Sequence, residues 1–499
     1  MKREPTISPF PVYTEQLSEE HSALLTAFFA EFNTHCLLPR REKQRLREDL
    51  EAAILWYAAA GVPLEEALRR LAVEHLGSFY AHPPILWFPL DSAAKIYPLS
   101  MEHGRMTLFR LSVYLKSAVV PELLQMALSF TIKRFPSFAT TLKKGFFWHY
   151  LDTAKRRFCI EEERHIPCQP LKVSRSGSQT FRVLYFQNRI SVEFFHVLTD
   201  GTGGIVFLKA LTSEYLRLMG AQAAADDPSW NVDVRPDAEE FSNEFPKHAP
   251  HGAASGFVDK PAVQMSGRLA RQKPCRVLHF KMDAAALKTA AAKYSATVTT
   301  YLLALIFLAG RDAADEATGD LNIQVPVNMR KFYPSRTVCN FSMYCGIRLP
   351  LDNNFDLPTL IQTISAQLKE KACKEPMDQM LTATVKLVDT LKYIPLILKQ
   401  PVAKLVYGFL GDNIFTTTLS NLGVVTMPEG WAEQIDSMDF VLGTAITNRA
   451  CCAMVTFGNT ATFSITKMTA DPTFEEQLYH LLQTDGVAVH VEGSELLED

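Results

Sequence analysis

The residues with the clearest chemical potential are a histidine, an aspartate and a glycine, His196, Asp200 and Gly201, spaced as His-x-x-x-Asp-Gly. A neutral imidazole, with a pKa of about 6.5, accepts a proton near neutral pH and is the commonest general base in enzymes. Gly203 and Gly204 follow at once, and glycines are costly in chain entropy unless the backbone bends tightly or approaches another group. The alternative for a lone histidine is a half-buried side chain bonded to a carbonyl. The glycine-rich turn favours a proton-transfer site.

The residues before His196 have the pattern of a β-hairpin. Two β-rich runs, at 180–186 and 190–196, are separated by a short turn. Because side chains alternate along a strand, His196 is expected at the strand end on the same face as Val192 and Phe194. The histidine therefore projects from an otherwise apolar face.

This hairpin is repeated in the second half of the chain. Residues 186–196 are echoed, at an offset of 271, by residues 457–467, and each copy leads through a loop into an amphipathic helix. The two halves thus look like divergent copies of one hairpin, loop and helix unit. Lys467 takes the place of His196 in the second copy, where it is expected either to lie in solvent at the strand end or to line the far mouth of the site and meet a phosphate group. Only the first copy keeps the chemistry.

Length and pattern predict two lobes with a helical appendage. A chain of 499 residues exceeds the size at which one hydrophobic core stops growing. Amphipathic helices are indicated in residues 1–82, and β and α patterns alternate afterwards. We expect a first lobe at 83–220, a crossover or linker without periodic apolar pattern at 221–274, and a second lobe at 275–499.

Composition argues against several other classes of protein. The net charge of −3 gives no positive field for nucleic acid. The nine cysteines are scattered without metal-ligand spacing and are expected to be reduced thiols, so no metal site is predicted. The longest apolar run, 298–309, is too short for a membrane span, and residues 1–11 lack an export signal, which favours a cytoplasmic protein. The mixed-charge stretch 40–45 is expected to be a solvated helix face.

Three stretches together resemble a known superfamily. Residues 196–201 (His-Val-Leu-Thr-Asp-Gly) resemble the signature shared by chloramphenicol acetyltransferase, plant BAHD acyltransferases, wax-ester synthases, alcohol acetyltransferases and peptide-synthetase condensation domains. Residues 325–330 (Val-Pro-Val-Asn-Met-Arg) look like its Pro-Val-x-x-Arg segment, and residues 420–423 (Ser-Asn-Leu-Gly) look like its Ser-Asn-x-Gly segment. With residues 90–94 as an opening strand, the resemblance covers about residues 83–485 and is closest to bacterial alcohol acetyltransferase-like proteins.

The resemblance implies a fold and specific roles. The fold is α/β, with two chloramphenicol-acetyltransferase-like lobes of mixed β-sheet and flanking helices beside the N-terminal appendage. His196 would be the general base, and Asp200 would form a structural salt bridge with Arg330 that ties the lobes together. Gly201 would let the turn pass without a side chain.

A donor from the second lobe is also implied. In the superfamily it stabilises the oxyanion, and Ser420 or Asn421 matches its region. Ser-Asn before a glycine is equally an ordinary turn. Two departures narrow the subfamily, since Phe195 stands where condensation domains carry a first histidine and the plant Asp-Phe-Gly-Trp-Gly segment is missing.

The resemblance implies transfer of an acyl group, most simply acetyl, from a coenzyme A thioester to a small alcohol. Coenzyme A would be a co-substrate and no cofactor would be permanently bound. One alternative keeps the same base but takes the acyl group from a carrier protein, for transfer to a hydroxyl or an amine. Another is a catalytically degenerate pair of lobes that serves as a binding scaffold, against which the intact motif at His196 argues.

Overall fold

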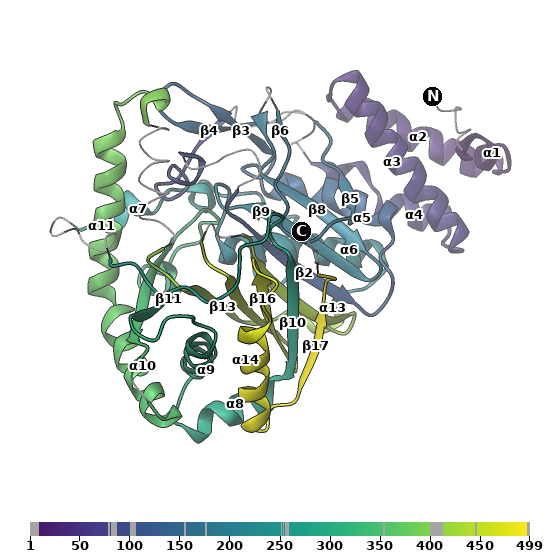
Figure 1. Cartoon of the computed structure of the whole chain (residues 1–499). Helices are drawn as coiled ribbons and strands as arrows, with labels where there is room; N and C mark the ends of the chain where they lie inside the picture. Colours follow the sequence, from purple (N-terminus) through teal and green to yellow (C-terminus); the bar gives the residue numbers. More distant parts are fainter. Residues whose placement is uncertain are drawn as a thin grey trace.

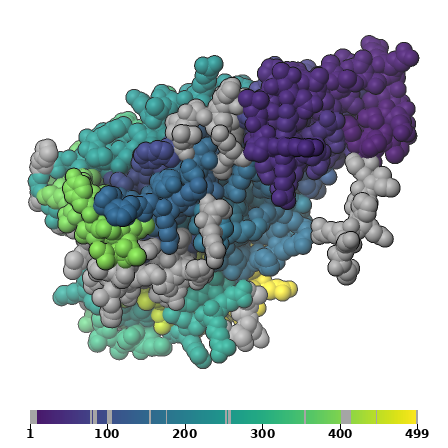
Figure 2. Space-filling view, turned by 90° about the horizontal axis from the view of Figure 1, so that it is seen from above, coloured from purple at the N-terminus to yellow at the C-terminus, as the bar shows by residue number. Residues whose placement is uncertain are grey.

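The computed structural model describes two α/β lobes and a helical appendage that projects from one side (Figures 1 and 2). The expected α/β class, with mixed sheets and flanking helices, is confirmed. The structure describes residues 9–77, 80, 87–99, 106–153, 156–174, 177–250, 252, 254, 259–352, 355–399, 413–444 and 447–496.

The appendage is a group of amphipathic helices. Its second helix begins where Ser18 accepts a hydrogen bond from the His21 backbone N–H, and the third begins after Pro39. The third helix buries Leu46, Leu50 and Tyr57, and the Tyr57 hydroxyl donates to the Leu218 carbonyl oxygen at 2.7 Å. This contact fastens the appendage to the first lobe. The helices are α1 (Phe10–Glu15), α2 (Glu19–His35), α3 (Arg40–Ala59) and α4 (Leu64–Arg70).

The first lobe is built on a five-stranded sheet in the order β14-β2-β9-β8-β5, packed against two helices. Four strands come from the first half of the chain, while β14 crosses over from the second half and pairs antiparallel with β2. The sheet of the first lobe therefore contains strands from both halves of the chain. The elements are β2 (Leu108–Leu115), β5 (Ile160–Glu162), β8 (Phe181–Phe186), β9 (Arg189–Phe195), β14 (Ile435–Leu442), α5 (Pro121–Thr131) and α6 (Gly201–Leu218).

A small sheet lies beside the first lobe, in the order β1-β4-β3-β7-β6. The strand expected at 90–94, directly after β1, is wrong, because residues 92–96 form turns. Asp91 Oδ1 accepts a hydrogen bond from the Ala94 backbone N–H at 2.7 Å, a local bond that favours a turn over a strand. The strands are β1 (Trp87–Pro89), β3 (Thr140–Lys144), β4 (His149–Thr153), β6 (Val173–Ser174) and β7 (Gly177–Ser178).

The second lobe is a seven-stranded mixed sheet in the order β12-β11-β13-β15-β16-β10-β17. The apolar run at 298–309 lies inside the buried helix α9, as its composition indicates. The elements are β10 (Arg276–Asp283), β11 (Asp320–Asn328), β12 (Ser342–Pro350), β13 (Thr417–Val425), β15 (Ala450–Phe457), β16 (Thr460–Lys467), β17 (Val489–Gly493), α8 (Ala284–Lys293), α9 (Val298–Asp312), α10 (Leu357–Lys371), α11 (Lys374–Leu391), α13 (Glu429–Ala432) and α14 (Thr473–Thr484).

The internal repeat corresponds to equivalent pieces of structure. The β8–β9 hairpin leads into α6, and the β15–β16 hairpin leads into α14. The expectation that Lys467 lies in solvent is wrong, since it is 2% exposed. Its ammonium group donates to the Asp471 carbonyl oxygen and pairs with Glu475, because a charge buried in the lobe requires a partner.

The crossover between the lobes contains only short helices, Ala238–Phe241 and α7 (Phe245–His248), within the described part of residues 221–274. Across the described ranges, no single helix combines the length and apolar character needed to cross a bilayer. The pair α8 and α9 meets that test only when joined across a 77° bend.

The start of α6 packs tightly against the second lobe, which generates a first prediction. A Cβ on Gly203 would lie 2.2 Å from both the Thr199 Oγ1 and the Val338 carbonyl oxygen. Gly203→Ala should therefore lower the free energy of unfolding by about 1–3 kcal/mol through overpacking. Chemical denaturation of the full-length protein measures the loss.

Gly310→Ala is the matched control, because Gly310 also lies in a helix and its added Cβ would meet only Leu321, at 3.5 Å. This variant should be neutral or more stable, since alanine favours helix over glycine by about 1 kcal/mol. Equal stability of the two variants would contradict the close packing at Gly203.

Candidate active site

His196 lies directly after β9, between two aromatic rings. Its ring centroid is 5.1 Å from that of Tyr97 and 4.9 Å from that of Phe109. Its backbone N–H donates to the Thr107 carbonyl oxygen at 2.9 Å, which continues the antiparallel pairing of β9 with β2. The side chain is half-buried. The sheet thus positions the imidazole, and the rings make its surroundings apolar.

Asn340, immediately before β12, determines which imidazole nitrogen carries the proton. Its amide nitrogen Nδ2 donates to Asp91 Oδ2 at 3.0 Å and to the His196 carbonyl oxygen at 2.9 Å, so both amide hydrogens face acceptors. The amide oxygen then faces His196 Nδ1 at 3.0 Å. Because an amide oxygen only accepts, Nδ1 carries the hydrogen and Nε2 keeps its lone pair. Nε2 is therefore the imidazole nitrogen that can accept a hydrogen bond or a proton.

Asp91 holds the Asn340 side chain in place by accepting its hydrogen bonds. Its Oδ2 accepts from both the backbone and the side-chain N–H groups of Asn340, while its Oδ1 caps the turn at Ala94. Burial raises the pKa of Asp91 to about 6, although these hydrogen bonds act in the opposite direction. Asp91, Asn340 and His196 thus form a chain of hydrogen bonds that starts in the first lobe, passes through the second and returns.

The environment keeps His196 neutral. Burial lowers the pKa of its imidazole below the ordinary value, and the hydrogen bond that Nδ1 donates to Asn340 and the charge of Asp200 only partly oppose this shift. A histidine with a lowered pKa is unprotonated at neutral pH. It is therefore competent to accept a proton.

Asp200 connects the lobes. Its Oδ1 accepts from the Gly203 backbone N–H at 3.1 Å and so caps α6. Its Oδ2 accepts from Arg330 Nη1 at 2.8 Å, from the Phe341 backbone N–H at 2.8 Å and from the Ser342 hydroxyl at 3.0 Å. Burial acts to raise the pKa of this carboxyl, but the Arg330 charge and the hydrogen bonds hold it below its usual value. Both carboxylate oxygens of Asp200 thus accept hydrogen bonds that hold α6 and the second lobe together.

Arg330 also holds the loop that carries Asn340. Its Nη2 donates to the Thr337 and Cys339 carbonyl oxygens at 2.9 and 2.7 Å, and its side chain is only 10% exposed. The arginine therefore links the start of α6 to the segment that orients His196.

The residues expected to supply an oxyanion donor lie in β13, at a β-bulge between Asn421 and Val424. Leu422 reaches the first lobe, since a Cβ on Gly201 would lie 2.7 Å from its Cδ2. Ser420 pairs with Ala453, which packs in the first-lobe core, so Ser420 faces the interface between the lobes.

Asn421 is bound within the second lobe. Its amide group donates to the Thr299 hydroxyl at 3.0 Å, and its Oδ1 accepts from the Gly423 backbone N–H at 2.8 Å. Of the two donor candidates, Ser420 has the better position.

Sequence reasoning missed Asn340, Tyr97 and the role of Asp91. Asn340 stands just before a strand, where an asparagine is unremarkable, and Asp91 was placed in a strand. No local pattern in the sequence marks these residues, because their contacts with His196 bridge residues far apart in the chain.

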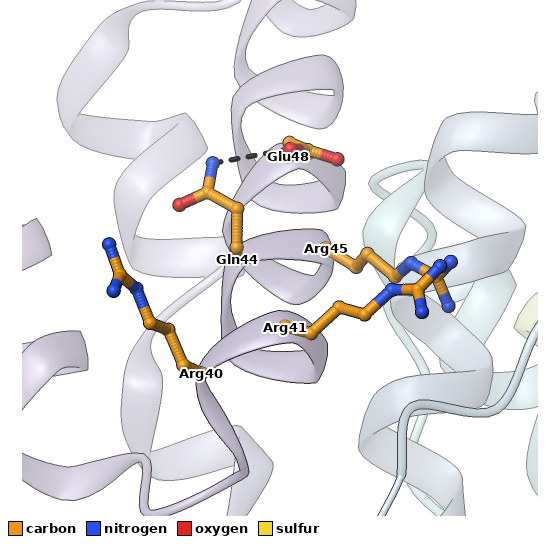
Figure 3. Close-up of a pocket in the computed structure, with 5 residues that line it drawn as sticks. All are labelled: Arg40, Arg41, Gln44, Arg45 and Glu48. Atoms are coloured by element: carbon orange, nitrogen blue, oxygen red, sulfur yellow. Dashed lines mark hydrogen bonds between the residues drawn. The ribbon is translucent and has the colours of Figure 1, made fainter.

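A surface pocket of about 630 Å³ lies elsewhere, on α3 (Figure 3). Its lining side chains all come from one helix, with Arg41 and Arg45 pointing to one side and Arg40 to the other. Gln44 donates to Glu48 at 3.2 Å along the same helix. This is the mixed-charge helix face expected from the sequence, and it contains none of the residues around His196.

The Asp200–Arg330 pair generates a stability prediction. Arg330→Ala should destabilise the protein by about 3–5 kcal/mol, because it leaves a buried carboxylate without its charged partner. Arg336→Ala is the control: Arg336 pairs with Asp237 on the surface and is about half exposed, so its loss should cost less than about 1 kcal/mol. Urea unfolding measures both, and similar small losses would show that the buried pair is dispensable.

Asn340 is predicted to fix the tautomer of His196. Selective ¹⁵N labelling of histidine should show His196 with a protonated Nδ1 at neutral pH, and Asn340→Ala should give a mixture of tautomers. Asn188→Ala, which removes a half-buried amide bonded to the Leu115 carbonyl oxygen, is the matched control and should leave the His196 signals unchanged. A single unchanged tautomer in Asn340→Ala would refute the assignment.

No protein-family model matches this sequence, and no curated protein matches it. Solved structures do match. The structure of TRI101 from F. graminearum, complexed with coenzyme A and T-2 mycotoxin, is 10% identical over 81% of this chain and 100% of that chain, with a TM-score of 0.54. The TRI3 trichothecene 15-O-acetyltransferase of Fusarium sporotrichioides is 12% identical over 80% of this chain and 94% of its own, with a TM-score of 0.51.

A condensation domain is similar to the same extent. The first condensation domain of the CDA synthetase is 12% identical over 80% of this chain and 96% of that domain, with a TM-score of 0.55. At these identities the comparison concerns the fold. The chain has the two-lobed fold of these acetyltransferase and condensation-domain structures, which confirms, at the level of the fold, the resemblance indicated by residues 196–201.

Proposed function

We propose that the protein is an acyltransferase that moves an acyl group from a thioester to an alcohol with His196 Nε2 as general base. The observation that carries this proposal is the Nδ1 hydrogen bond to Asn340, which leaves Nε2 as a lone-pair acceptor beside Tyr97 and Phe109. The lowered pKa of His196 keeps that acceptor unprotonated at neutral pH. Positioned general bases of this kind accelerate reactions by about 10²–10⁴-fold.

The proposed reaction runs through two steps. The acceptor hydroxyl loses its proton to Nε2 as its oxygen attacks the thioester carbonyl carbon, and the carbonyl electron pair moves to the oxygen as an oxyanion. Collapse of this intermediate breaks the carbon–sulfur bond, and the leaving thiolate takes the proton from the imidazolium. The products are an ester and a free thiol, and His196 returns to its starting state.

Ser420 is the proposed hydrogen-bond donor to the oxyanion. Its support is its position on the face of β13 toward the first lobe, with the neighbouring Leu422 against Gly201. Asp200 and Arg330 are proposed as positioning residues, because their hydrogen bonds are used to hold α6 and the Asn340 loop.

For the donor we propose coenzyme A, in line with the coenzyme A complex among the similar structures. The condensation domain among them favours a second candidate, a thioester on a carrier protein, with a hydroxyl or an amine as acceptor. Assays with acetyl-CoA and with acetylated carrier protein, each against a panel of alcohols and amines, distinguish these donors. Failure with every donor would favour the scaffold alternative.

His196→Ala should abolish acyl transfer, measured as release of free thiol, while the thermal unfolding temperature changes little. His490→Ala is the matched control, because His490 is a strongly exposed histidine on β17. It should retain full activity. Retained activity in His196→Ala would remove His196 from the mechanism.

The activity should also depend on pH in a defined direction. Since the pKa of His196 is lowered, the decline of kcat/KM as Nε2 becomes protonated should be centred below the ordinary histidine pKa of about 6.5. The Asn340 hydrogen bond raises the pKa of His196, so Asn340→Ala should move the decline to lower pH. A decline centred above pH 6.5 would contradict the assignment.

A further inference from the structure

Exposed apolar side chains gather on one face of the protein. Among the described residues, six of the sixteen large hydrophobic side chains that are exposed come from two short segments, the β3–β4 turn and the stretch after α11. Phe146 is 72% exposed, Tyr393 77% and Ile397 78%. Single exposed hydrophobic residues are ordinary, whereas a cluster marks an interaction site. We call the cluster and its flanking lysines the aromatic–lysine surface: Phe146, Phe147, Tyr393, Ile394, Ile397, Leu398, Lys144 and Lys392.

The two segments hold each other in place. The Leu396 backbone N–H donates to the Phe146 carbonyl oxygen at 2.8 Å, and the Lys399 ammonium group donates to the Phe147 carbonyl oxygen at 2.7 Å. Lys399 also lies 3.2 Å from the centroid of the Trp148 ring. Figure 2 shows the bright green end of this helical region beside the blue surface of the first lobe. The aromatic–lysine surface is therefore one continuous face.

The charge on these segments opposes that of the whole chain. Residues 143–152 and 386–399 contain five lysines against two aspartates, a net charge of +3, whereas the whole chain has a net charge of −3. Lys144 and Lys392 are exposed beside the aromatic and aliphatic tips. Of these five lysines, Lys399 is buried and Lys143 pairs with Asp152. The positive charge exposed beside the apolar side chains is that of Lys144 and of Lys392, which lies 3.9 Å from Asp389.

We propose that the aromatic–lysine surface binds the anionic face of a lipid bilayer. Aromatic rings settle at the boundary between headgroups and acyl chains, and aliphatic side chains insert below it. Lysines beside them are attracted to anionic headgroups and extend their long side chains toward them. The exposed apolar tips of the two segments, with Lys144 and Lys392 beside them, match that boundary in polarity and charge.

One contact connects the segment beside this surface with the segment that carries Asp91 and Tyr97. Lys95 lies 5.9 Å from the Trp148 ring centroid, between Asp91, which supports Asn340, and Tyr97, which packs on His196. The inference itself rests on the surface alone and does not require acyl transfer.

Flotation of the full-length protein with vesicles tests the proposal. The protein should bind phosphatidylcholine vesicles that contain phosphatidylglycerol more strongly than pure phosphatidylcholine vesicles, and added salt should weaken this binding. The double variant F146S/I397S should bind at least about tenfold more weakly, because it removes two apolar tips. K144E/K392E should lose the preference for phosphatidylglycerol.

The matched control is F186S/L37S, which removes an exposed phenylalanine at another hairpin end and an exposed aliphatic residue of the appendage. It should bind vesicles like the unmodified protein, and all variants should share its unfolding temperature. Absence of vesicle binding by the unmodified protein, or an equal loss in the control, overturns the proposal. A dimer that becomes monomeric only in F146S/I397S, without vesicle binding, would assign the surface to a second copy of the chain and also overturn it.

Discussion

The geometry around His196 depends on the buried ion pair between Asp200 and Arg330. One carboxylate caps α6 and meets the start of β12, while one guanidinium binds the carbonyl oxygens of the loop that ends at Asn340. Two buried charges are expensive to desolvate, so a pair of this kind contributes little net stability and instead fixes one arrangement of its neighbours. Here it fixes how the lobes meet, and with that the distance from Asn340 to His196.

The hydrogen bonds of Asn340 orient the His196 imidazole. Asp91 accepts from its amide, the amide oxygen faces His196, and the imidazole is left with one free nitrogen. Tyr97 and Phe109 keep the surroundings of the ring apolar, and burial lowers its pKa. The same packing that orients the base thus keeps it unprotonated.

The second copy of the hairpin unit has the same local structure but carries a lysine, Lys467, at the position of His196. Lys467 stands at the end of β16 as His196 follows β9, yet it is buried in a pair with Glu475 of the following helix. Asp471 still accepts a hydrogen bond from the Thr473 backbone N–H near the start of α14. The second copy therefore retains a hydrogen-bonded turn before its helix, and the residue at the repeat position of His196 is used in a buried ion pair.

The sequence by itself determined the hairpin, the turn, the repeat and the two-lobed α/β class, because strand alternation, glycine in tight turns and amphipathic periodicity are local properties. It also indicated the residues His196, Asp200 and Arg330 through a resemblance of short motifs. Only the tertiary structure decided that Asn340 and Asp91 orient the imidazole, that Lys467 is buried, and that β14 completes the sheet of the first lobe. These features depend on contacts between residues about one hundred or more positions apart or on the burial of a charge, and neither leaves a periodic signal in the chain.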